Sequence, residues 1–181
     1  MGLKQARRLC VGALLAAMIC LATMLIKLPI AVAHGYVHPG DIFIYLAAMT
    51  LGPPAGLSAA IGSALADALS GIYAVYAPPT LLIKGLMGYA AGRALGGIGS
   101  VRSAVSAASV KKRGVLYHAV VFGACGAFMA MGYWLVDTML FGAAAAAAAV
   151  PMNLLQGLFG AVGGTLLSRA NLGRLKPFLD G

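Results

Sequence analysis

The chain has 181 residues, and it has few charges and very few acids. Charged residues make up 9% of it, whereas a soluble domain carries about 25%. Its four acidic residues are all aspartates, and it has no glutamate. Hydrophobic residues make up 61% of the chain. These numbers exclude an ordinary soluble domain, and they exclude a disordered chain, which needs low hydrophobicity and high charge.

Sequence motifs of common enzymes are missing as well. We find no G-x-x-x-x-G-K-[ST] loop for ATP, no H-E-x-x-H zinc motif and no G-x-S-x-G nucleophile motif. Four aspartates without a pair at catalytic spacing leave little for acid–base chemistry. The three cysteines lie inside apolar runs and give no disulfide framework. We therefore expect neither an enzyme nor a bound cofactor.

What the chain does contain is a series of long apolar runs. A membrane helix needs roughly 20 mostly apolar residues. We expect an all-α integral membrane protein, a single domain over 1–181 with six transmembrane helices. The second run is short for a span, so it should occupy a thinned or protein-lined site, or begin in the loop before it. The expected spans are about 9–32, 39–52, 55–76, 79–96, 115–141 and 143–168.

The basic residues orient these spans. If all six runs cross, eleven of the thirteen basic residues fall on one side, with the N-terminus, the 93–113 loop and the C-terminus. The positive-inside rule makes that side cytoplasmic. Both termini should then be cytoplasmic. The net charge of +9 is explained by the membrane surface, and nucleic acid is not an expected partner.

Polar residues within the expected spans gather towards the opposite, external side. Ionisable groups inside a membrane are costly, so each is a candidate functional residue. A channel or a proton relay would need polar groups through the full depth. The pattern therefore favours a pocket open to the outside. The candidate substrate-binding residues are Tyr36, His38, Asp41, Asp67, Tyr73, Lys84, Trp134, Asp137, Asn153 and Gln156.

Structural alternatives exist for several of these residues. Asp67 and Lys84 are equally compatible with an ion pair between the third and fourth spans, and the tyrosines and Trp134 with an interfacial aromatic belt. His34 and His38, with Asp41, suggest a metal site. Gly35 and Pro39 oppose the helical spacing that such a site would use, so no metal is expected.

Small residues recur at helical spacing below the polar ones. The patterns Lys84-x-x-x-Gly88 and Gln156-x-x-x-Gly160 put a polar group above a glycine on one helix face. Small residues let helices approach closely, so these polar groups should converge. The face of Ala13-x-x-x-Ala17 carries no polar member. It is available for docking on another helix or another protein.

The region from Tyr36 to Gly92 resembles a known family. It contains GD…LGPPAG…GSALADALSG and, further on, YAP and IKGLMG. These motifs are similar to the substrate-binding S components of energy-coupling factor (ECF) vitamin transporters, in the group that carries riboflavin, pyridoxine and hydroxymethylpyrimidine. The likeness covers the second to fourth spans well and the remainder by layout only.

The resemblance implies a role. An S component captures a vitamin outside a bacterial or archaeal cell membrane. It then docks on a membrane coupling protein, the T component, which is joined to two ATPase subunits. In this chain, the family's alanine motif would correspond to Ala13 and Ala17, which would contact the coupling protein. The first outer loop, residues 29–40, would act as a lid. The pocket would lie among the fourth to sixth spans and the outer loops.

The vitamin itself stays open, because no complete substrate motif matches. Aromatic rings with Asn153 and Gln156 suit a flat heterocycle such as pyridoxine, hydroxymethylpyrimidine or riboflavin better than a linear acid such as pantothenate. The alternative function is a stand-alone secondary carrier or channel for a small polar solute.

Overall fold

The computed structural model describes residues 3–26, 28–30, 35–71, 73–96 and 114–170. This part of the chain is helical apart from one short hairpin and the connecting turns, as the all-α prediction requires. A 3-10 turn, η1 (Ala74–Tyr76), precedes the fourth helix. The hairpin consists of β1 (Leu28–Ile30) and β2 (Gly35–Val37). The helices are α1 (Leu3–Leu25), α2 (Gly40–Leu51), α3 (Ala55–Leu69), α4 (Ala77–Leu95), α6 (Val115–Phe141) and α7 (Ala143–Leu167).

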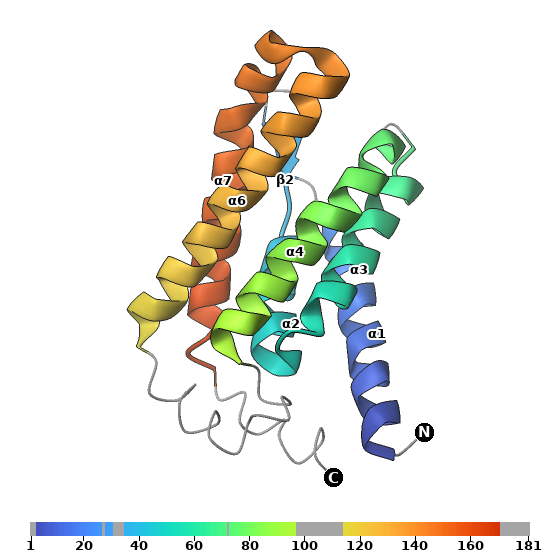
Figure 1. Ribbon diagram of the computed structural model, residues 1–181, viewed down its shortest axis with the longest axis vertical. Helices are drawn as coiled ribbons and strands as arrows, with labels where there is room; N and C mark the ends of the chain where they lie inside the picture. The colour runs from blue at the N-terminus through green and yellow to red at the C-terminus, as the bar shows by residue number, and fades with distance from the viewer. Residues whose placement is uncertain (1–2, 27, 31–34, 72, 97–113, 171–181) are drawn as a thin grey trace.

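The helices form two groups that meet on α2 (Figure 1). On one side, α6 and α7 run antiparallel and pack closely at two glycines: a Cβ added to Gly126 would lie 2.9 Å from the Cα of Gly157. On the other side, α1, α3 and α4 pack together, and α2 and β2 lie between the groups. The starts of α1 and α6 and the ends of α4 and α7 share one end of the molecule (Figure 1).

Apolar side chains on the outside identify a membrane protein. Three helices, α1, α6 and α7, are long and apolar enough to cross a bilayer, whereas α2 and α3 are apolar but shorter. On α3, four exposed residues follow a four-residue spacing that makes one continuous stripe: Leu57, Ile61, Leu65 and Leu69. The opposite face of α3 is buried and consists mainly of alanine, glycine and serine.

The short helix α2 is enclosed by the rest of the protein. Nine of its twelve residues are buried, and it contacts α1, α3, α4 and α7. Of the three explanations for a short second span, the protein-lined site is therefore the one the structure supports. A helix of 12 residues spans only about 18 Å at 1.5 Å per residue, and β2 lies directly before it in the chain, between the two groups (Figure 1).

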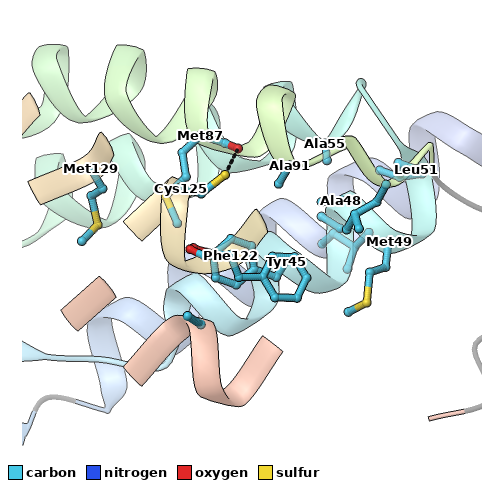
Figure 2. Close-up of a cluster of buried hydrophobic side chains, with 14 of the residues drawn as sticks. Tyr45, Ala48, Met49, Leu51, Ala55, Met87, Ala91, Phe122, Cys125 and Met129 are labelled. Atoms are coloured by element: carbon cyan, nitrogen blue, oxygen red, sulfur yellow. Dashed lines mark hydrogen bonds between the residues drawn. The ribbon is translucent and has the colours of Figure 1, made fainter. Parts of the chain in front are cut away.

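An aromatic pair anchors the core at the middle of α2 (Figure 2). The rings of Tyr45 and Phe122 stack with centroids 4.1 Å apart, and the Tyr45 hydroxyl donates to the Phe122 carbonyl oxygen at 2.9 Å. The thiol of Cys125 lies beside them and faces the Met87 carbonyl oxygen. A Cβ added at Gly164 would lie 2.7 Å from the Tyr45 ring, so α7 needs glycine there to approach α2.

Three expected boundaries differ from the structure. The first helix ends at Leu25 rather than 32, because residues from Leu28 onward pair with β2 as a strand. The third ends at Leu69, and Gly71, with φ of +65°, begins the turn. The fourth begins at Ala77 with prolines in its first turn, where a missing N–H costs nothing. Lys84 therefore lies two turns into α4, deeper than the single turn expected.

The packing at Gly164 gives a stability test. We expect Gly164→Ala to lower the free energy of unfolding by about 1–3 kcal/mol, because the added methyl overpacks the Tyr45–Phe122 pair. The measurement is unfolding of the purified protein in detergent. Gly123→Ala is the matched control, because a Cβ there meets nothing within 4 Å; it should leave stability unchanged or raise it. Equal effects at the two glycines would contradict this account.

Candidate functional site

The first of two polar clusters joins α2, α4 and α7. We define the Asp41 cluster as Asp41, Lys84, Gln156 and the backbone of His38. Lys84 Nζ lies 2.5 Å from Asp41 Oδ1, and the two side chains are 3% and 0% exposed. Gln156 Nε2 donates to Asp41 Oδ2 at 3.0 Å. Helices α2 and α4 thus meet at one buried ion pair, and α7 adds a hydrogen bond to it.

Gln156 also holds the segment that follows the hairpin. Its Nε2 donates to the His38 carbonyl oxygen at 3.0 Å, and its Oε1 accepts from the His38 N–H at 3.0 Å. The His38 ring turns back on the chain, and its Nδ1 accepts from the Gly40 N–H at 3.2 Å. The side chain of one α7 residue therefore ties down the stretch between β2 and α2.

Local sequence explains why these groups meet. Asp41 lies in the first turn of α2, where a carboxylate is favourable to the helix dipole. Gly160, one turn below Gln156, makes room for it: an added Cβ would lie 2.7 Å from the Asp41 Cβ. The predicted convergence of polar residues above glycines is therefore observed for α7. Lys84 Nζ also contacts the Met129 sulfur, which brings α6 to the cluster.

The second cluster lies nearer the start of α4 and the end of α6. We define the Asp137 cluster as Tyr76, Thr80, Tyr133 and Asp137. The Tyr76 hydroxyl donates to Asp137 Oδ1 at 2.6 Å, and the Thr80 and Tyr133 hydroxyls are 2.9 Å apart. The Tyr76 and Tyr133 rings meet edge to face at 6.3 Å. The Tyr133 ring lies 5.8 Å from Lys84 Nζ, so the two clusters adjoin.

Tyr76 connects further candidate residues to the Asp137 cluster. Burial raises the pKa of the Tyr76 phenol, and the Asp137 carboxylate raises it further, with smaller contributions from Tyr73 and Asp67. Tyr76 therefore stays a neutral hydrogen-bond donor. Asp67 is buried at the corresponding end of α3, and Tyr73 is half-buried. The structure thus gathers acidic and phenolic groups around the turn between α3 and α4.

Other predicted site residues are less closely joined. Lys84 itself belongs to the Asp41 cluster, and its ion pair is with Asp41 rather than with Asp67, the partner that the structural alternative gave it. Asn153 is half-buried one turn before Gln156, and the Trp134 side chain is 40% exposed. The Tyr36 backbone pairs with Pro29 in the hairpin. His34 lies outside the described residues, and within the described ranges no three histidine, cysteine or acidic residues form a group suited to a metal.

Tyr76 and three further residues of the site are absent from the candidates chosen from the sequence. Thr80 lies four residues before Lys84, and Tyr133 and Met129 lie four and eight residues before Asp137. Residues four apart share a helix face. Extending the four-residue spacing from each charged residue would have found all three. Tyr133 is the inward neighbour of Trp134, the aromatic residue the sequence singled out.

The small face of α1 borders a separate feature. A groove of about 630 Å³ runs between α1 and α3, and both Ala13 and Ala17 line it. Both alanines are exposed. The helix face predicted to be available for docking is therefore exposed and forms one wall of a groove.

The buried ion pair gives a second test. Lys84→Met leaves the Asp41 carboxylate buried without its cation, so we expect a loss of about 3–5 kcal/mol in unfolding free energy. Adding Asp41→Asn should restore most of the loss, because the amide keeps an acceptor oxygen without the charge. Detergent unfolding of both single variants and the double variant measures the coupling. Additive losses would mean that the pair is not the source of the effect.

Comparisons with known proteins agree with this architecture. The family model described as "ECF-type riboflavin transporter, S component" matches residues 4–172. An uncharacterized protein of Pyrococcus woesei is 31% identical over 163 residues, which is 90% of this chain and 99% of that protein. The chain therefore belongs to the S-component family of ECF-type transporters, whose members are substrate-binding transport subunits of the membrane and not enzymes.

Proposed function

We propose that this chain captures a water-soluble vitamin or vitamin precursor with a heterocyclic ring and passes it to an ATP-driven importer. In this proposal all six helices cross the membrane of a bacterial or archaeal cell, with both termini cytoplasmic. The T component and two ATPase subunits supply the energy. The supporting observation is the adjacency of the Asp41 and Asp137 clusters, which combine aromatic faces, a buried cation and carboxylates between α4 and α6–α7.

The chemistry of the two clusters favours a flat, polar ring. Tyr76 and Tyr133 offer aromatic faces and hydroxyls at one place. Asp137 accepts hydrogen bonds from N–H or hydroxyl groups of a ligand. Lys84, beside the Tyr133 ring, offers its ammonium to a ring carbonyl or a phenolic oxygen. Pyridoxine, hydroxymethylpyrimidine and riboflavin all carry such groups, and a linear acid such as pantothenate offers no ring to the tyrosines.

The hairpin is the proposed lid of this pocket. The β1–β2 hairpin corresponds to the first outer loop, and the stretch that follows it is held by Gln156 through the His38 backbone. Opening the lid requires Gln156 to give up these hydrogen bonds. Substrate entry is thereby linked to the Asp41 cluster, since the same amide also donates to Asp41.

The first experiment identifies the ligand. The chain is purified alone in detergent from cells grown in rich medium, denatured, and any released small molecule is identified by mass spectrometry. One heterocyclic vitamin per chain would support capture without ATP. An empty protein that binds no B vitamin or precursor, or one that binds pantothenate and no heterocycle, would contradict the proposal.

A matched pair of aromatic variants on α6 tests the pocket. We expect Tyr133→Ala to weaken binding of the identified vitamin at least about tenfold, which corresponds to about 1.4 kcal/mol, because it removes the stacking face beside Lys84. Phe128→Ala removes an aromatic ring from the exposed face of the same helix and should change affinity less than about twofold. Calorimetric titration of both proteins measures this. Similar losses in the two variants would place the pocket elsewhere.

The docking role of α1 is tested by uptake. We expect Ala13→Trp and Ala17→Trp to abolish vitamin uptake in cells that contain the coupling module, while purified variants still bind vitamin, because the bulky rings block close helix approach. Ala127→Trp, at an exposed position on α6, is the control and should leave uptake intact. Uptake that persists in both α1 variants, or in liposomes without ATPase subunits, would favour a stand-alone carrier.

A further inference from the structure

The groove between α1 and α3 has a chemistry unlike that of the two polar clusters. Its walls carry Ala13, Ala17 and Leu21 of α1 and Leu57, Ile61 and Leu65 of α3. Leu21 and Leu57 on its borders are 54% and 68% exposed, so the groove opens sideways where the apolar surface faces lipid.

Two polar groups inside the groove, on Ser58 and Cys20, already have partners. The Ser58 hydroxyl donates to the Gly12 carbonyl oxygen at 2.9 Å, and the Cys20 thiol faces the Met24 sulfur. A vitamin site needs a few polar groups that fix the orientation of the ligand. These walls offer apolar surface instead, which suits a hydrocarbon chain.

One end of the groove is basic. Arg8 is among the lining residues, and Lys4 lies four residues earlier on the same face of α1. No acidic residue occurs in α1. An arginine is well suited to a phosphate, because its planar guanidinium stays charged and matches the geometry of the anion.

The length of the groove matches one lipid leaflet. From Arg8 to Leu21, α1 rises about 20 Å at 1.5 Å per residue, and half of a hydrocarbon core of roughly 30 Å is about 15 Å. We propose that the groove binds one acyl chain of an anionic phospholipid, with the headgroup phosphate on Arg8. The lipid belongs to the leaflet at the N-terminal end of α1. This proposal does not depend on transport, since it concerns the chain alone.

Native mass spectrometry of the purified full chain tests the site. The delipidated protein is titrated in detergent with phosphatidylglycerol or phosphatidylcholine. We expect one phosphatidylglycerol to be retained about fivefold more tightly than phosphatidylcholine, the preference that one basic residue gives to an anionic lipid. Arg8→Gln should remove this preference. The control Arg7→Gln changes an exposed neighbour outside the groove and should keep most of it.

A second pair of variants tests the apolar part. Ala13→Trp with Ala17→Trp fills the groove and should abolish retention of the lipid, whereas Ala127→Trp on α6 should not. Unfolding in detergent establishes that each variant is folded, and the Arg8→Gln result stands if the double tryptophan variant is not. Equal retention of the two lipids, loss of the preference in Arg7→Gln as well, or a dimer of the chain that retains no lipid would overturn the proposal.

Discussion

A buried ion pair between Asp41 of α2 and Lys84 of α4 constrains much of this fold. Within the protein, Asp41 and Lys84 each balance the charge of the other, because an uncompensated charge in an apolar interior costs several kcal/mol. The first turn of α2 must therefore reach the second turn of α4. Gln156 completes the coordination of Asp41 from α7. The ion pair and this amide bring the two helical groups together at the level where α2 begins.

The same constraint bears on the short helix α2, which carries Asp41 in its first turn. The segment directly before α2 is non-helical, and the Gln156 side chain of α7 holds it through the His38 backbone. The glycines of α7 serve the same arrangement, because they let α2 approach closely enough for Asp41 and Tyr45 to reach their partners.

Much of the architecture could be predicted from the sequence, but the contacts between residues of different helices and strands could not. Apolar runs and glycine spacing indicated the helices and the inward faces of α4 and α7, because both follow from periodicity. Lys84 was found as a candidate, but its pairing with Asp41 depends on how α2 is placed in three dimensions. The first span was predicted to continue to residue 32, past Pro29, because the apolar run continues there, whereas the hairpin arises from pairing with residues further along the chain. Tyr133 was overlooked in favour of Trp134, since composition alone does not say which neighbour faces inward.

The hydrogen bonds from Gln156 to His38 involve only main-chain atoms of that residue. Any amino acid except proline presents the same N–H and carbonyl group at this position. The contact with Gln156 therefore places almost no demand on the side chain at position 38. That side chain is free to differ between relatives, while the two hydrogen bonds that join α7 to the start of α2 stay the same.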